Sequence, residues 1–382
     1  MTAKFTIDGS DALEAHLAHT CSGILAGVRS IIPAAELEAL VLGGGYGRGQ
    51  GGVFKTDSGD RPYNDLEFYV FIRGNVLVTE RKYRHPLNEL GDKLSPAAGL
   101  HVEFKVYSVE KLKRTPVSMF TYDLVAGHRI ICGDMEIFKS CSHHLAADQI
   151  PLYEATRLLV NRCSGLLLAK DFLRNSSLSG EQNDFIVRNI AKAQLAFGDA
   201  LLTAFGKYHW SCTERHHRLG KLFASESLPR SEDILKHHAL GVEFKLHPKF
   251  IHVTHESLDQ LHHEISRLGQ QVWLWNESRR LHHPFISAKD YAMACLNKCP
   301  ETVPWKNSLL NLRTFGPPGI LNSQAFRYPR ERLMNALALL LWEDDCLTDS
   351  QLKARVQQQL RASSAGWTNV LGSYKTIWQN YG

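Results

Sequence analysis

The chain has 382 residues, of which 44% are hydrophobic and 22% are charged. A length of this kind predicts about two or three domains, and the composition excludes a disordered, collagen-like or coiled-coil chain. The formal net charge of +5 is too small to indicate nucleic-acid binding by itself, so nucleic acid is not the expected partner.

The first part of the chain predicts one helix and three strands. Apolar residues recur at helical spacing over Ser10–Ile31, and Ser10 is expected to be the N-cap of this helix. Apolar runs predict strands over Leu37–Leu42, Leu66–Ile72 and His101–Ser108.

The rest of the chain has the pattern of helices. Apolar residues at three- and four-residue spacing predict helices over the following ranges: Ala155–Leu173, Phe185–Phe205, Leu258–Leu281, Arg330–Trp342 and Gln351–Leu360. The expected fold class is therefore α+β, with a small mixed-sheet domain over residues 1–140. A mainly α-helical domain follows over residues 141–382, with room for two helical subdomains.

Three absences bear on localisation. The segment Met1–Phe5 has no basic region followed by an apolar stretch, which argues against a signal peptide. The longest mainly apolar run, Leu333–Trp342, is about half as long as a bilayer span and predicts a buried helix. The eight cysteines form no Cys-x-x-Cys pair, which is typical of reduced thiols. We therefore expect a cytoplasmic protein without a membrane partner.

Glycine occupies seven positions of the segment Val41–Gly52, directly after the first predicted strand. The bare backbone N–H groups of such a turn can approach an anion closely, as in a phosphate-binding nest. Arg48 would add a bidentate phosphate donor. No Gly-Lys-Ser/Thr follows, so the segment is not a Walker A motif. From this segment alone, a phosphate site and an ordinary glycine-rich turn both stay open.

Two carboxylates stand at the head of the second predicted strand. Asp65 and Glu67 are two residues apart, and such residues face the same side of a strand. Like charges this close are unfavourable without a cation between them, and Mg²⁺ prefers carboxylate oxygens together with substrate phosphates. Glu103 in the third strand could complete the cluster if it faces the same side. The alternative is that Glu103 pairs with Lys105 and that the other two acids lie on a solvated face.

The order of these features resembles the nucleotidyltransferase superfamily typified by DNA polymerase beta, and above all its minimal and aminoglycoside-type members. A Gly-Gly turn, here Gly44 and Gly45, is followed by Asp-x-Asp/Glu on a strand, here Asp65 and Glu67. A lone acid on a later strand completes the order, here Glu103. The resemblance covers about residues 35–135.

The resemblance implies magnesium-dependent transfer of a nucleotidyl group to a hydroxyl of a small molecule or protein, with release of pyrophosphate. The group that is expected first is AMP, with ATP as the donor. Glu103 would act as a third metal ligand or as the general base. The implied roles are metal binding and catalysis by Asp65, Glu67 and Glu103, and triphosphate binding by Gly44, Gly45 and Arg48.

Two departures from the family pattern keep alternatives open. The loop between Gly45 and Asp65 is longer than is usual in the family, and Gln50 stands where relatives often have Glu. One alternative is a non-catalytic nucleotide-binding or regulatory module, for example the partner of a toxin. The other is an RNA-end nucleotidyltransferase, which would need a basic, aromatic-lined surface.

Basic residues elsewhere have ordinary explanations. Adjacent histidines such as His216 and His217 point in different directions on a helix and chelate a metal poorly, so we expect surface or partly buried histidines rather than a zinc site. The neighbouring Arg215 and Arg218, with Lys221, are expected to lie on a solvated helix face.

Overall fold

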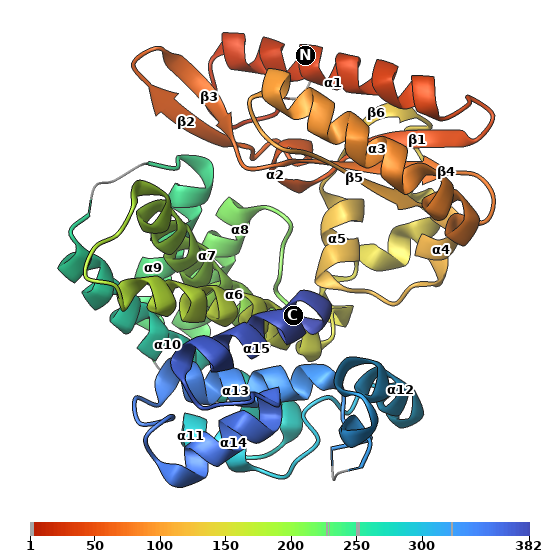
Figure 1. The fold of residues 1–382 in the computed structure, drawn as a ribbon. Helices are drawn as coiled ribbons and strands as arrows, with labels where there is room; N and C mark the ends of the chain where they lie inside the picture. Colours follow the sequence, from red (N-terminus) through yellow and green to blue (C-terminus); the bar gives the residue numbers. More distant parts are fainter. Residues whose placement is uncertain (1–3, 227, 229, 250–252, 322–323) are drawn as a thin grey trace. The chain divides into compact units, whose positions relative to one another are not determined.

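The computed structural model describes residues 4–226, 228, 230–249, 253–321 and 324–382. A small mixed sheet near the N-terminus is followed by helices, which confirms the α+β fold class (Figure 1). The chain divides into two compact units, one of residues 1–154, 202–227 and 235–251, and one of residues 155–201, 228–234 and 252–382. Residues 202–227 and 235–251 thus belong to the first unit, and the predicted division into domains at residue 140 stays a prediction.

A four-stranded sheet forms the centre of the first unit, with the strand order β5-β4-β1-β6. The bounds of the strands are Leu37–Leu42 for β1, Leu66–Ile72 for β4, Val102–Tyr107 for β5 and Arg129–Gly133 for β6. β4 pairs in parallel with β5, whereas β1 pairs antiparallel with β4 and β6, so the sheet is mixed. The first two predicted strands are confirmed at both ends, and the third is shorter by one residue at each end.

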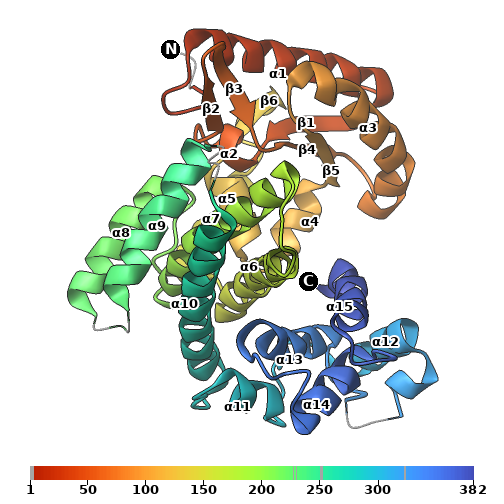
Figure 2. The ribbon, with the colours of Figure 1, turned by 60° about the vertical axis from the view of Figure 1, so that its left-hand side comes forward.

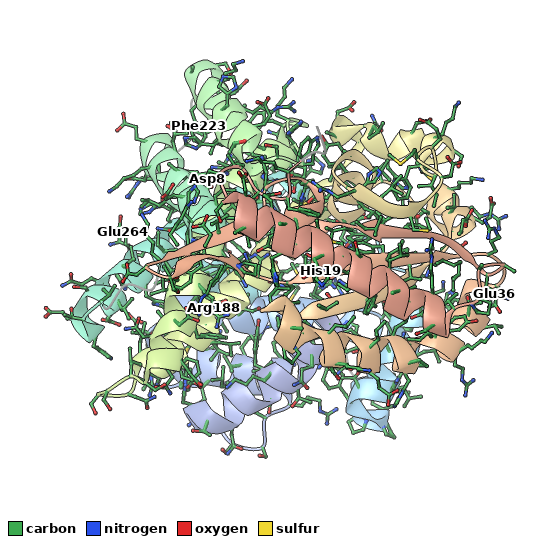
Figure 3. All side chains as sticks on the ribbon, turned by 90° about the horizontal axis from the view of Figure 1, so that it is seen from above. Asp8, His19, Glu36, Arg188, Phe223 and Glu264 are labelled. Carbon is green, nitrogen blue, oxygen red and sulfur yellow. The ribbon has the colours of Figure 1, made fainter. Side chains whose placement is uncertain are left out.

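Two long helices cover one face of this sheet. α1 (Asp11–Ile31) begins after Ser10, whose side chain accepts a hydrogen bond from the Leu13 N–H, so the predicted N-cap is confirmed. α3 (Val76–Ala98) is the crossover that a parallel pair such as β4 and β5 requires. Seen from above in Figure 3, the two helices lie side by side, with His19 on α1. The core below them is apolar and includes Leu17, Ile24, Leu42, Phe68, Val70 and Phe104.

The opposite face of the sheet carries shorter elements, as Figures 1 and 2 both show. They are α4 (Val109–Arg114), α5 (Met119–Ala126) and a 3₁₀ helix, Lys139–Leu145. Val41 and Phe71 of the sheet belong to the buried apolar cluster on this side. The side chains of β4 and β5 that share this face therefore lie toward α5 rather than toward α1.

The glycine-rich segment forms a single helical turn that leads into a hairpin. The elements are α2 (Gly44–Gly47), β2 (Gly52–Thr56) and β3 (Gly59–Tyr63). The hydroxyl oxygen of Tyr46 lies 2.8 Å from the Gly52 carbonyl oxygen and accepts a hydrogen bond from the Tyr63 N–H at 2.8 Å. This buried tyrosine therefore closes the base of the hairpin next to the glycine turn.

Helices account for most of the remaining described chain. Those that the sequence predicts are confirmed, with the bounds Leu152–Leu173 (α6), Gly180–Ala204 (α7), His255–Leu281 (α10), Pro329–Trp342 (α13) and Ser350–Leu360 (α14). Those without a prediction are Cys212–Ser225 (α8), Ser231–Leu246 (α9), Ala288–Met293 (α11), Pro304–Phe315 (α12) and Trp367–Tyr381 (α15). Within the ranges that the structure describes, no helix combines the length and apolar character needed to cross a bilayer.

Candidate active site

Glu67 and Glu103 are neighbours on one face of the sheet. β4 and β5 pair in parallel with Glu67 opposite Glu103, and adjacent strands lie about 4.8 Å apart. The next residue of each strand, Phe68 and Phe104, packs into the core on the α1 side. Because strand side chains alternate, both carboxylates face the other side, the one on which α5 lies.

Asp65 lies just before β4 and is exposed. It follows Asn64, whose φ of 74° is in the left-handed region where the hairpin returns to the sheet. Asp65 is two residues from Tyr63, whose N–H donates to the Tyr46 hydroxyl, and its charge adds to the burial that raises the pKa of Tyr46. Among the described residues, Asp65 has no hydrogen-bond or ion-pair partner.

The glycine turn lies directly against Glu67. The Gly43 N–H donates to the Glu67 carbonyl oxygen at 2.9 Å. Gly44 has a φ of +60°, and a Cβ atom there would lie 2.7 Å from Glu67 Oε1. Any side chain at position 44 would therefore strain the backbone and displace the carboxylate. The position of the Glu67 carboxylate therefore depends on glycine at position 44.

Tyr69 holds the other oxygen of Glu67. Its hydroxyl donates to Glu67 Oε2 at 2.9 Å. Burial raises the pKa of Tyr69, and the neighbouring Glu67 and Glu103 charges raise it further, so the phenol remains a donor at neutral pH. Glu67 Oε1 has no hydrogen-bond partner within the described part of the chain. This oxygen is therefore available to a cation.

Glu103 has a cation next to it already. Lys105 Nζ lies 3.2 Å from Glu103 Oε2, with each side chain 41% exposed. In the described ranges, no group of three or more histidine, cysteine or carboxylate side chains is arranged to hold a metal ion. Two carboxylates are enough for Mg²⁺ when substrate phosphates supply further oxygens. By their donor chemistry, Asp65 and Glu67 are the pair that could hold such an ion, and this assignment stays a prediction.

Arg48 connects the glycine turn to α5. Its Nη1 donates to Asp123 Oδ2 at 2.6 Å, and its Nε donates to the Gly44 carbonyl oxygen at 2.8 Å. The side chain is only 12% exposed. A contact between Arg48 and a β- or γ-phosphate remains a prediction, and it would require the guanidinium to share or leave these partners.

Arg48→Met is expected to lower the free energy of unfolding by about 3 kcal/mol, because it leaves the Asp123 carboxylate without its cation. Urea unfolding without nucleotide, followed by circular dichroism, measures this change. The double variant Arg48→Met, Asp123→Asn should recover part of the loss, since the orphaned charge is then removed as well. An unfolding midpoint that the single substitution does not move would contradict the structural role of this ion pair.

Gln50 is buried and joins the glycine-rich segment to the start of α8. Its Oε1 accepts a hydrogen bond from the Cys212 N–H at 2.9 Å, and its Nε2 donates to Ser211 Oγ at 2.6 Å. A carboxylate at this position would lose the Nε2 donor. The two hydrogen bonds to the start of α8 therefore explain why an amide, and not a carboxylate, stands at position 50.

Lys245 on α9 is a candidate that sequence patterns did not reveal. Its carbonyl oxygen lies 3.1 Å from where a Cβ atom of Gly52 would be. The ammonium group has no hydrogen-bond or ion-pair partner among the residues that the structure describes. Burial lowers the pKa of Lys245 to about 8, and the charge of Arg48 contributes to the shift. No motif marks this residue, because only the fold brings α9 to the glycine segment.

The prediction of a solvated basic face on α8 is wrong for Arg215. This side chain is 2% exposed, and its Nη1 donates to the carbonyl oxygens of His209 at 2.8 Å and Trp210 at 3.2 Å. The Arg215 side chain reaches back to the segment that precedes α8, so it packs inward. His216 shares a contact with His238, in which the two rings stack with their centroids 5.4 Å apart.

Comparison with known proteins gives a sparse result. No family model matches the chain, and no curated protein matches it. Among solved structures, the chain is similar to the crystal structure of spectinomycin adenyltransferase AAD(9) from Enterococcus faecialis with ATP and spectinomycin. The sequence identity is 15%, the match covers 65% of this chain and 98% of that chain, and the TM-score is 0.35. A likeness at this level shows neither a family nor a function for this chain.

Proposed function

We propose that this protein transfers AMP from ATP, with Mg²⁺, to a hydroxyl group of a small molecule or protein and releases pyrophosphate. The observation that carries the proposal is the parallel pairing of Glu67 with Glu103, beside a glycine turn whose residue 44 lies against the Glu67 carboxylate. Carboxylates next to a bare backbone turn suit a substrate that brings both phosphates and a divalent cation.

The triphosphate would lie along the glycine turn. Gly44 and Gly45 have no side chains that could keep phosphate oxygens away from the backbone. Lys245 would supply positive charge, since its ammonium has no acidic partner in the described structure. Arg48 would support the turn through the Gly44 carbonyl oxygen and through Asp123.

A bound Mg²⁺ would neutralise the developing charge on the triphosphate, and Asp65 and Glu67 are the residues that would hold it. Glu103 would take the proton from the acceptor hydroxyl as the new oxygen–phosphorus bond forms at the α-phosphate. The bond from the α-phosphate to the bridging oxygen breaks, and pyrophosphate leaves with that electron pair. Lys105 would keep the Glu103 carboxylate oriented through their 3.2 Å contact.

The direct test uses labelled ATP, GTP, CTP and UTP with candidate acceptors, and measures both binding and pyrophosphate release with and without Mg²⁺. We expect Mg²⁺-dependent turnover that disappears in the Asp65→Ala, Glu67→Ala variant while its circular dichroism stays unchanged. Mg²⁺-dependent binding that this variant retains in full would contradict the metal assignment. Binding without turnover by any acceptor would instead favour a nucleotide-binding module, for which the Glu103–Lys105 ion pair is the structural argument.

The affinity for ATP is expected to fall as the pH rises through 8. Lys245 has a pKa of about 8 in the folded protein, so its ammonium is charged below that pH and neutral above it. Loss of a charged donor predicts a roughly tenfold larger Kd at high pH, and a bound triphosphate would move the midpoint upward by favouring the charged form. Equilibrium titrations of ATP from pH 7 to pH 10 measure the effect.

Two variants control this pH experiment. Lys245→Met should bind weakly at every pH and show a flat profile. Lys249→Met removes an exposed lysine whose ammonium lies 3.6 Å from Glu243, and it should keep the profile of the unmodified chain. An equally steep pH dependence in Lys245→Met would refute the assignment of Lys245.

A further inference from the structure

The helical second unit has an open surface cavity of about 500 Å³ beside α13 and α14, helices that lie next to each other in Figures 1 and 2. Its lining includes Arg332 of α13 and Arg361 at the end of α14, together with the amide side chains of Gln324, Gln357 and Gln358. No carboxylate is among its described lining residues. The cavity therefore combines positive charge with neutral hydrogen-bonding groups.

Arg332 is the unusual member of this lining. Its side chain is 2% exposed, and its Nε and Nη2 atoms are buried without any hydrogen-bond partner in the described structure. A buried guanidinium without partners is unfavourable, since it has lost water and gained nothing comparable. The Phe315 ring, whose centroid lies 4.4 Å from the guanidinium carbon, gives partial compensation.

The acid next to Arg332 in the chain does not balance this charge by a hydrogen bond. Glu331 precedes Arg332, but its Oε2 accepts from the Lys298 N–H at 2.9 Å and lies 3.7 Å from Arg327 Nη1. Burial lowers the pKa of Arg332 to about 10, and the charge of Arg361 contributes to the shift. Two positive groups thus line the same cavity, and no carboxylate is among its described lining residues.

Arg361 is an exposed residue at the end of α14. It is the C-cap of α14 with a left-handed φ of 53°, and its Nη1 lies 3.4 Å from the Phe315 carbonyl oxygen. Phe315 therefore contacts both arginines, through its ring and through its carbonyl group. Gln324 donates to Gln359 Oε1 at 3.2 Å, which holds one of the amides at the cavity.

We propose that this cavity binds a phosphorylated small molecule, with Arg332 and Arg361 as ligands of the phosphoryl group. Guanidinium groups from two different helices, with amide donors beside them, suit a tetrahedral anion whose oxygens point in several directions. A cavity of about 500 Å³ exceeds the needs of a phosphate ion and is in the usual range for small-molecule sites. The remainder of the ligand would contact the amides of Gln357 and Gln358, which suits hydroxyl groups. This site is independent of the proposed nucleotidyl transfer.

Calorimetric titration of the full chain tests the proposal, with ribose 5-phosphate, inorganic phosphate and ribose as probes, at constant ionic strength and with EDTA present. We expect saturable binding of ribose 5-phosphate, weaker binding of phosphate and none of ribose. Arg361→Gln should weaken ribose 5-phosphate binding by about 10- to 100-fold. Lys353→Gln removes the same charge from an exposed position on α14 outside the lining and should leave binding unchanged. Full-strength binding by Arg361→Gln, or no binding of either phosphate compound by the unmodified chain, would overturn the proposal.

Hydrogen exchange locates the site and separates it from the glycine turn. Ribose 5-phosphate should protect peptides that cover residues 311–321 and 353–362, and not those that cover residues 43–52. Protection confined to residues 43–52 would assign the phosphate to the first unit and refute the cavity. Arg332→Met gives a further readout, because removing a buried unpartnered charge should raise or preserve the Tm while abolishing binding. A lower Tm combined with unchanged binding would show that Arg332 has a structural role only.

Discussion

Glu67→Gln is expected to reduce nucleotidyl transfer by roughly 100- to 1000-fold, with the fold intact. The substitution preserves the size of the side chain and an oxygen that can accept from the Tyr69 hydroxyl, which lies 2.9 Å from Glu67 Oε2. What it removes is the negative charge of the carboxylate, whose Oε1 lies against Gly44. The measurement is kcat/KM for ATP at several Mg²⁺ concentrations, together with the Tm of each variant.

Glu38→Gln is the matched control for this experiment. Glu38 is a half-buried residue of β1, the strand adjacent to β4, and the control therefore makes the same chemical change in the same sheet. We expect it to change kcat/KM by less than about twofold, because it is at the opposite end of β1 from the glycine turn. If both variants lose activity equally, the loss reflects general damage to the sheet and the catalytic assignment of Glu67 fails.

Gly47→Ala is expected to lower the free energy of unfolding by about 3 kcal/mol or more and to abolish activity with it. A Cβ atom at this position would lie 2.1 Å from the Leu42 carbonyl oxygen and 2.7 Å from its carbon. Those atoms belong to the backbone of β1, so relief requires a shift of the strand or of the glycine turn. Urea unfolding followed by circular dichroism measures the change.

Gly23→Ala makes the same chemical change at a position where a Cβ atom has room. Gly23 is an exposed position inside α1, and a Cβ atom there would meet nothing within 4 Å. Alanine should therefore stabilise the protein by about 0.5–1 kcal/mol, since it restricts the unfolded chain and favours the helix. Equal effects of the two substitutions would show that crowding at position 47 does not constrain the turn.

Two of the three predicted strands, β1 and β4, were predictable because they are buried. β1 and β4 are almost continuously apolar, and burial on both faces of a sheet produces such runs. β6 and the strands of the hairpin are half-exposed, and their pairing depends on backbone hydrogen bonds to distant segments. No local apolar pattern marks strands of this kind.

α3 shows a second reason why local patterns fail. Pro86 and Pro96 lie inside this helix, where proline ordinarily ends or kinks a helix. Tyr83 and Leu87 are nevertheless buried in the core that α3 shares with α1 and the sheet. Tertiary packing along this face outweighs the unfavourable local propensity.

The candidate site was predictable in its residue types but not in its contacts. Apolar runs indicated that Glu67 and Glu103 lie on strands, and no local signal determines that these two residues face each other across parallel strands. The Arg48–Asp123 bond joins residues far apart in the sequence, and Lys245 is farther still. Contacts between residues so far apart in the sequence depend on the whole fold, and no local sequence pattern predicts them.

The hairpin between the glycine turn and Asp65 adds residues to the chain between them, while its two ends, Gly52 and Tyr63, stay paired with each other. Both of its ends are fastened at the base, one through the Gly43 N–H to the Glu67 carbonyl and the other through Tyr46 to Tyr63. Its tip can therefore lengthen or shorten without moving the groups at the base. A sequence motif that requires a fixed number of residues between the glycine turn and the acid would therefore miss this chain. The tip of the hairpin is also a suitable place to insert a reporter peptide.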